Sequence, residues 1–387
     1  MSLMKKVVVY HSLDALSGSH DAESGNADAA SSVFLSLPWF RNLDETALEP
    51  HTRLRIYGIE PSAEQQHPCM ALPMCHAPRH RLFAPRRLRP LANFYTSLFG
   101  PLTSRSEAPT DEVIGLLVHA ITRDVPRWDT VSLTPLEVES PVFDKLLKAF
   151  RSAGMAVQSY FCFGNWYLDV NGRSYREYFD ALPSRMRNTI TRKSRQLERE
   201  GRIHIRIIAN ASEAEEGLSA YEQVHDVSWK TREPFPAFIP GLVRLCARHG
   251  WLRMGVAYID GKPVAAQIWI VHQRIASIYK LAYDERFSQF SVGSILTARL
   301  MQHVIDTDRV SEVDFLNGDE PYKKDWMSHR RERWGIVAFN LRTFHGALAA
   351  LRHLGARAIK NGIARSARAQ SRIGQIRHTR LSRQFLD

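Results

Sequence analysis

The stretch LRMGVAYIDGKPVAAQIWIVHQRIASIYKLAYD (252–284) decides the fold of this chain. It contains three runs rich in β-branched, aromatic and other apolar residues, which is typical of buried strands. Asp260 and Gly261 separate the first two runs and form a dipeptide that favours a two-residue hairpin. The stretch therefore predicts three antiparallel strands that follow one another along the chain.

The segments on either side of these strands carry alternating helix and strand patterns. PSRMRNTITRKSRQLEREG (183–201) predicts a helix, with a proline in its first turn and a glycine at its end. Residues 202–208 alternate as a strand, and residues 292–307 predict a helix. A strand over residues 333–341 closes the pattern. The expected order is helix, strand, helical segments, three antiparallel strands, helix, strand, short helix and strand.

The N-terminal part also mixes helix and strand patterns. Residues 142–154 predict a helix and residues 156–170 a strand. Residues 61–90 contain six prolines and predict a loop, and residues 1–30, rich in Ser, Ala, Asp and Gly, predict a flexible terminus. The whole chain is therefore expected to be of the mixed α+β class, with mostly antiparallel sheets flanked by helices.

Length and composition indicate a globular protein with more than one core. At 387 residues the chain exceeds the usual size of a single domain. Its 44% hydrophobic and 24% charged residues are ordinary globular values, and no apolar run approaches the roughly 18 residues of a membrane span. Four cysteines are too few for a disulfide framework, which favours a reducing, cytoplasmic location.

The net charge of +12 is concentrated at the C-terminus. Residues 342–387 hold ten of the 52 Lys and Arg residues but one of the 40 acidic residues, so the rest of the chain is close to balance. Three interpretations of this basic tail remain open: a solvated segment, a helix on an anionic membrane surface, and a nucleic-acid contact. Nucleic acid is disfavoured because Phe344 and Phe385 are the tail's only aromatic residues apart from histidine.

The segment after the third strand has the pattern of an anion site. The strand ends at Tyr283, and a loop leads into a helix that begins near Ser291. Free N–H groups at a helix start, together with the helix dipole, attract phosphate, and Gly293 allows a close approach to the backbone. The pattern predicts either a site for a diphosphate-bearing cofactor or an ordinary helix start.

DFLNGDEPYKKDW (314–326) is the second segment with reactive side chains. It reads as a short buried strand followed by a turn that places Tyr322, Lys323, Lys324 and Trp326 close together. Phenol and ammonium groups are used in acid and electrostatic catalysis. The alternative is packing of a strand–helix junction and a solvated face.

In this order of motifs the chain resembles the BioF2-like/CelD-type acyltransferases of the Gcn5-related N-acetyltransferase (GNAT) superfamily, which are related to the FemAB peptidyltransferases. The resemblance covers roughly residues 30–342 and implies two tandem GNAT-like halves, residues 31–170 and a catalytic half at residues 171–342, followed by a basic tail at residues 343–387. The stretches that carry it are LRPLANFYTSLFGPL (88–102), NWYLDVNGRSYREYFDALPSRMRNTITRKSRQLEREG (165–201), YEQVHDVSWK (221–230), VAAQIWIV (264–271), YKLAYDERFSQFSVGSILTARLM (279–301) and DFLNGDEPYKKDW (314–326).

The resemblance implies an acyl-CoA-dependent N-acyltransferase in which a primary amine attacks the thioester directly. Acetyl-CoA is the first donor candidate, and an amino sugar of polysaccharide or cell-envelope biosynthesis is the first acceptor candidate. FemAB relatives use aminoacyl-tRNA instead, but the long heptad helix pair that is common among them is missing here. The third alternative is a non-catalytic protein that binds a membrane or nucleic acid through residues 343–387.

The resemblance also assigns roles to individual residues. Tyr322 would protonate the leaving thiolate, Lys323 would be its electrostatic partner, and Asp314 would steer Lys323 or act as a base. Gln289 to Ser294 match the superfamily's phosphate motif in part. The residues expected to hold the donor are Tyr283, Ser291, Val292, Gly293 and Ser294.

The acceptor is expected to contact residues on two helices. His225, Trp229 and Lys230 lie in YEQVHDVSWK, and Asn188 lies in the helix over residues 183–201. No metal is expected, because the His and Cys residues of HPCMALPMCHAPRH (67–80) lack the spacing of a standard zinc finger.

Overall fold

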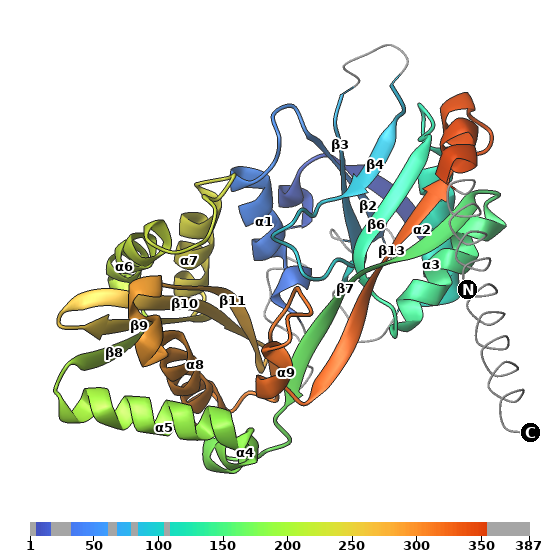
Figure 1. Ribbon diagram of the computed structural model, residues 1–387. Helices are drawn as coiled ribbons and strands as arrows, with labels where there is room; N and C mark the ends of the chain where they lie inside the picture. Colours follow the sequence, from blue (N-terminus) through green and yellow to red (C-terminus); the bar gives the residue numbers. More distant parts are fainter. Residues whose placement is uncertain (1–4, 17–31, 61–67, 79–83, 104–108, 354–387) are drawn as a thin grey trace, which may run out of the picture.

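The computed structural model describes residues 5–16, 32–60, 68–78, 84–103 and 109–353. It consists of a large, mostly antiparallel sheet with helices on its faces (Figure 1). The strands are β1 (Lys6–Tyr10), β2 (Arg53–Glu60), β3 (Met70–His76), β4 (Arg87–Pro90), β5 (Leu102–Thr103), β6 (Thr130–Glu137), β7 (Ala156–Asp169), β8 (Ile203–Ile208), β9 (Leu252–Ile259), β10 (Lys262–His272), β11 (Ile275–Tyr283), β12 (Glu312–Asp314) and β13 (His329–Phe339).

The helices follow the order expected from the sequence. The region from α5 onward runs α5, β8, α6, α7, β9, β10, β11, α8, β12, α9 and β13, so the predicted order and the mixed α+β class are confirmed. The bounds are α1 (Leu37–Thr46), α2 (Asp111–Arg123), α3 (Pro141–Ser152), α4 (Tyr175–Ala181), α5 (Ser184–Arg199), α6 (Ala214–Asp226), α7 (Phe238–Arg248), α8 (Val292–Gln302) and α9 (Lys323–Trp326), with the short helices η1 (Leu13–Leu16), η2 (Val33–Leu35), η3 (Ala211–Glu213), η4 (Glu285–Phe290) and η5 (His303–Thr307).

The strand meander β9–β10–β11 is buried on both faces. Asp260 and Gly261 both have positive φ, at 50° and 77°, which is the geometry of the predicted hairpin turn. Along β10, Ile268 and Ile270 belong to the core shared with α6 and α7, whereas Trp269 belongs to the core shared with α8. Figure 1 shows α6 and α7 on one side of these strands and α8 and α5 on the other.

The last strand, β13, returns to the N-terminal part of the chain. It pairs with β6 on one side and β7 on the other, both antiparallel. β7 in turn pairs with β12, so the sheet is continuous from β1 to β8. In Figure 1, β7 and β13 run together from the N-terminal strands toward α9. Segments far apart in the sequence therefore meet where α9 lies.

Two expectations for the N-terminal region are wrong. Residues 6–10, expected to be flexible, form β1 and pair along their whole length with β2. Residues 61–90, expected to be a loop, include β3 and β4. β3 accommodates Pro73 because β5 pairs with residues 70–71 of β3 and β4 with residues 74–75, and Pro73 falls in the gap between them.

Part of the basic tail lies within the described residues. Residues 344–353 form a helix that packs through Ala350, which is buried, and through His353 against the ring of Phe339 at 5.4 Å. The remaining 354–387, on which the membrane and nucleic-acid interpretations chiefly rest, lie outside the described residues.

Candidate active site

The candidate site lies where two parallel strands separate. β11 and β12 pair for only three residue pairs, from Ile275–Glu312 to Ser277–Asp314. β11 then continues to Tyr283, while the chain after Asp314 turns away into α9. A cavity of about 480 Å³ lies at this separation. Its lining is Phe94, Tyr95, Ser97, Trp229, Lys230, Ile278, Tyr279, Lys280, Leu281, Phe315, Leu316, Asn317, Glu320, Tyr322 and Lys323.

A β-bulge interrupts β11 at the cavity wall. Ile268 of β10 pairs with Lys280 and the next residue, Trp269, pairs with Ile278, so Tyr279 has no residue opposite. An extra residue of this kind breaks the ladder and redirects the strand. The Tyr279 hydroxyl donates to the carbonyl of Tyr95 at 3.2 Å. The regular β10–β11 ladder is therefore interrupted beside the cavity.

Tyr322 lies at the cavity wall, immediately before α9. Its side chain is 46% exposed, and its ring meets the edge of Phe315 at a centroid distance of 5.8 Å. Partial burial, with a further contribution from the Glu320 carboxylate, raises the pKa of Tyr322 to about 12. The phenol is therefore protonated at neutral pH and has a proton to donate.

Lys323 is buried and its ammonium is fully engaged. Nζ donates to the carbonyl oxygens of Phe315 (3.5 Å) and Asn317, and it forms an ion pair with Glu320 at 2.9 Å. These contacts close the turn that carries Tyr322. To act as the electrostatic partner of a reacting group, Nζ would have to leave these acceptors.

Asp314 anchors the same turn from the other end. Its carboxylate pairs with Arg331 at 2.6 Å and accepts hydrogen bonds from the amide of Asn165 at 2.5 Å and from the N–H of Leu316 at 2.6 Å. These contacts tie β12 to β7 and β13. The suggested contact of Asp314 with Lys323 is absent from its partners in the described residues.

Arg331 and Asn165 are structural residues that the sequence did not reveal. Arg331 also pairs with Glu312 at 2.6 Å, and its Nε donates to the side-chain oxygen of Asn165 at 2.7 Å. Burial raises the pKa of Glu312, although Arg331 opposes this effect. No local motif marks these partners, because Asn165 lies 149 residues from Asp314 in the chain and Arg331 comes from the returning strand β13.

The residues predicted to hold a phosphate come together at the start of α8. Ser291 has a left-handed φ of 55° and no side-chain capping bond, and the first helical bond runs from the Ile295 N–H to the Ser291 carbonyl. The N–H groups of residues 292–294 point beyond the helix end as a consequence of helix geometry. A Cβ added at Gly293 would be 3.6 Å from Tyr283, an ordinary contact. Packing alone therefore does not require glycine there.

Trp229 links the start of α8 to the cavity. Its ring lies 4.6 Å from that of Tyr283, and Trp229 and Lys230 both line the cavity. The structure thus brings Tyr283, Trp229, Lys230, Tyr322 and the α8 start into one region.

His225, on α6, is buried and does not line the cavity. Its Nε2 atom has no hydrogen-bond partner within the described residues.

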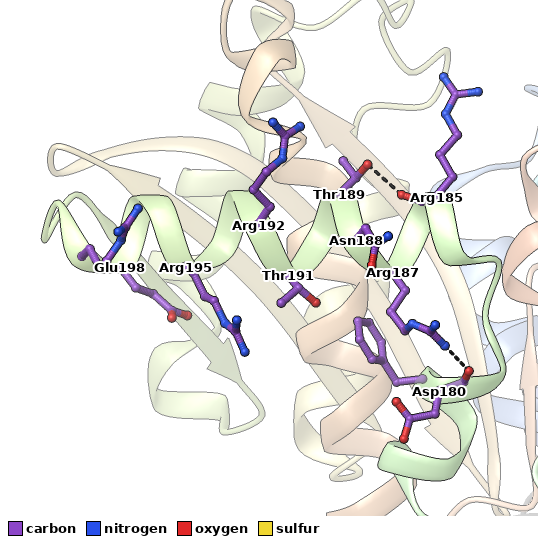
Figure 2. Close-up of a pocket in the computed structure, with 11 residues that line it drawn as sticks. Asp180, Arg185, Arg187, Asn188, Thr189, Thr191, Arg192, Arg195 and Glu198 are labelled. Atoms are coloured by element: carbon purple, nitrogen blue, oxygen red, sulfur yellow. Dashed lines mark hydrogen bonds between the residues drawn. The ribbon is translucent and has the colours of Figure 1, made fainter.

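A second hollow lies along α5, away from this cavity (Figure 2). It has a volume of about 1090 Å³ and includes Asn188, which was expected to contact the acceptor. Figure 2 shows Arg185 and Arg192 on one side of α5, and Arg187 and Arg195 on the other. Because these guanidinium groups diverge, they do not form a clamp for one small anion. Asn188 is therefore not brought together with the other predicted residues.

An ion pair at the cavity wall, between Lys280 and Glu233, was not predicted from the sequence. Lys280 of β11 pairs with Glu233 at 2.6 Å, and the hydroxyl of Tyr95 donates to the other oxygen of Glu233 at 2.7 Å. Burial alone would raise the pKa of Glu233, but the bonds from Lys280 and Tyr95 hold it below its usual range. The signal available was Lys280 itself, a charge within an otherwise apolar strand.

Among the described residues, no group of three or more His, Cys, Asp or Glu side chains is arranged to hold a metal ion. None of the helices in that part of the chain combines the length and the apolar character that crossing a bilayer demands.

A family model and several solved structures resemble this chain. Residues 184–324 match the acetyltransferase (GNAT) domain. The chain carries a GNAT domain. This GNAT domain runs from the start of α5 into α9, so it includes both the α8 start and Tyr322. No curated protein matches the chain in sequence.

The solved structures extend the likeness beyond the GNAT domain. FemX is 7% identical, with 86% of this chain and 97% of FemX covered and a TM-score of 0.57. A tandem GNAT protein of the clavulanic acid biosynthesis pathway (14% identity, 86% and 98% coverage, TM-score 0.44) and L-PGS from Bacillus licheniformis (13%, 87% and 99%, 0.46) are more distant in fold. The FemX comparison shows a shared fold across most of the chain, in agreement with the expected relation to FemAB proteins.

Proposed function

We propose that this protein is an N-acyltransferase that takes an acyl group from acyl-CoA, acetyl-CoA being the first candidate, and transfers it to a primary amine. One observation carries the proposal. The separation of β11 and β12 opens a cavity that has a protonated phenol, Tyr322, in its wall and the anion-attracting start of α8 at the other end of β11.

The donor would bind along β11. The N–H groups of Val292, Gly293 and Ser294 suit its phosphates, and Tyr283 with Trp229 forms the apolar path from there to the cavity. Backbone N–H groups of β11 beyond its pairing with β12, next to the bulge at Tyr279, would polarise the thioester carbonyl.

The reaction follows from these positions. The amine nitrogen attacks the thioester carbon, the C–S bond breaks, and Tyr322 gives its proton to the departing thiolate. The proton released from the attacking nitrogen restores the phenol, directly or through water. Lys323 and Asp314 hold the turn that positions Tyr322, and neither needs to touch the substrate.

Several broader assignments belong to the same proposal. The acceptor is an amino sugar used in polysaccharide or cell-envelope synthesis, and the protein acts in the cytoplasm, with the tail at residues 343–387 as a means of reaching the inner face of a membrane. Residues 31–170 and 171–342 are the two halves, of which the second is catalytic.

A titration of acyl-CoA into the protein tests the donor. Acetyl-CoA and longer acyl-CoAs are expected to bind saturably in a calorimeter, and saturable binding by none of them would remove the CoA assignment.

Tyr322→Phe is expected to keep donor binding and to lower kcat by about 10²- to 10³-fold. Tyr258→Phe, on β9 outside the cavity, is the matched control. Equal kcat values for Tyr322→Phe and Tyr258→Phe would refute the role of Tyr322 as the acid.

A second candidate donor is aminoacyl-tRNA. The FemX-like fold and the arginines of α5 favour it, since FemAB relatives use such donors. Filter binding with charged tRNA distinguishes the two donors.

The third candidate is a binding protein that acts through its tail. It predicts that deletion of residues 354–387 abolishes function, whereas the enzyme proposal predicts that chemistry in solution survives.

A further inference from the structure

The charges around the cavity are paired, with one exception. The cavity lining contains three lysines, Lys230, Lys280 and Lys323, and one acid, Glu320. Lys280 pairs with Glu233 at 2.6 Å, and Lys323 pairs with Glu320 at 2.9 Å. Two of the three ammonium groups are thus neutralised by the protein.

Lys230 has no such partner within the described residues. Its Nζ lies 5.8 Å from the centroid of the Trp229 ring, and no hydrogen bond or ion pair joins it to that part of the chain. Glu233 is not free to serve, because one carboxylate oxygen accepts from Lys280 and the other from Tyr95. The half-buried ammonium faces the cavity as an uncompensated positive charge.

This arrangement has an energetic cost. Burial and the neighbouring Lys280 lower the pKa of Lys230 to about 8, with a smaller contribution of the same sign from Lys323 and opposing ones from Glu233 and Glu320. At pH 7 the ammonium form still predominates by about tenfold. A cavity that holds a charged, unpaired lysine is complementary to an anion.

We propose that Lys230 binds a carboxylate or phosphate group carried by the molecule that enters this cavity, so that the substrate of this enzyme is acidic. Calling the bound molecule a substrate rests on the proposed function, but binding of an anion to Lys230 can be measured without turnover. The anionic group has two sources: the acceptor, as an acidic amine, or the transferred acyl chain, as a dicarboxylic acyl group. The aromatic walls at Trp229, Phe315 and Tyr322 suit the remainder of either molecule.

Differential labelling of lysines tests the subsite without catalysis. The full-length protein is treated with trace deuterated acetic anhydride at pH 8, and labelling of Lys230 is measured by peptide mass spectrometry against the exposed Lys262. Glucosamine 6-phosphate and muramic acid are compared with glucosamine, and succinyl-CoA is compared with acetyl-CoA. At least fivefold protection of Lys230 by the member of either comparison that carries the additional carboxylate or phosphate, and not by its counterpart, is the expected result.

The comparison in which protection of Lys230 is seen, sugars or acyl-CoAs, identifies the acceptor or the acyl chain as the source of the anion. Lys230→Met is expected to lose about tenfold in affinity for that acidic ligand, while Lys230→Arg and Lys262→Met retain it. Equal protection by both members of each comparison, or no protection by any of them or by 50 mM inorganic phosphate, overturns the inference. Acyl transfer that is no faster with the acidic amines than with glucosamine, and no faster from succinyl-CoA than from acetyl-CoA, would overturn it while leaving the acyltransferase assignment intact. Protection of Lys230 without acyl-CoA binding would do the reverse.

Discussion

The cavity at β11 and the hollow along α5 are both basic, and they differ in how their charges are arranged. In the cavity, two lysines are neutralised by Glu233 and Glu320 and a third is left facing the opening. Along α5, the arginines diverge from opposite sides of one helix. The hollow along α5 is the larger of the two, at about 1090 Å³ against 480 Å³. Side chains from several elements converge on the cavity, whereas the lining of the larger hollow comes mostly from one helix.

The largest effect is expected at Lys323, which holds the turn below Tyr322. Lys323→Met removes the donor to two carbonyl oxygens and the partner of Glu320, and it should lower the free energy of unfolding by about 2–3 kcal/mol. Urea denaturation measures this, with the exposed neighbour Lys324→Met as the control. If both variants unfold at the same urea concentration, the cavity is not organised by paired charges as described.

At the start of α8, Gly293→Ala separates packing from ligand contact. The new methyl group meets Tyr283 at an ordinary distance, so the fold should tolerate it, yet it occupies the surface that a phosphate would approach. We expect about a tenfold rise in the Kd for acetyl-CoA, equivalent to about 1.4 kcal/mol. Gly115→Ala, in the interior of α2 with no atom within 4 Å of the new methyl group, is the control. An unchanged Kd would place the phosphates elsewhere.

Lys230→Met should make the protein more stable, because it removes an unpaired charge. The gain should be roughly 1 kcal/mol at pH 7, a typical size for one substitution. Below pH 8 both the folded and the unfolded chain carry the proton; between pH 8 and the ordinary pKa of 10.5 only the unfolded chain keeps it. Wild-type stability therefore rises with pH over that interval, and the advantage of the variant shrinks. Thermal unfolding at pH 7 and pH 9.5 measures this change, and an advantage that is undiminished at pH 9.5 would show that the pKa of Lys230 is not lowered in the folded chain.

The smallest effect is expected on α5. Replacing Arg192 and Arg195 by glutamine removes two diverging, solvent-facing charges, so acetyl-CoA affinity and turnover should change by less than twofold. Steady-state kinetics and tRNA filter binding are measured on the same variant. A large loss of tRNA binding together with activity would reverse the ranking of the two regions in favour of the aminoacyl-tRNA donor.

The sequence predicted what depends on local periodicity. The order from α5 to β13 and the Asp260–Gly261 hairpin follow from patterns a few residues long, and the structure agrees with them. The strand at Pro73 was missed because its tolerance depends on a gap between two neighbouring strands, which no local pattern reports.

The site was predictable in part for the same reason. The positions of Tyr322 and the α8 start follow from motifs beside predicted elements. The partners of Asp314 and Lys280 did not follow, because Arg331, Asn165 and Glu233 approach through tertiary pairing. Asn188 was grouped with the acceptor residues by sequence resemblance alone, and the structure places it in the α5 hollow.

The return of β13 to the N-terminal strands has a consequence for how the protein is made. Arg333 pairs with Glu137, 196 residues earlier, so the central strands of the sheet cannot pair completely until β13, which follows the GNAT domain, has left the ribosome. Contacts of such long range slow folding. During synthesis β6 and β7 present open edges that invite pairing with other chains. Cutting the chain between β7 and α4 would make that transient exposure permanent, and we expect neither fragment to fold alone.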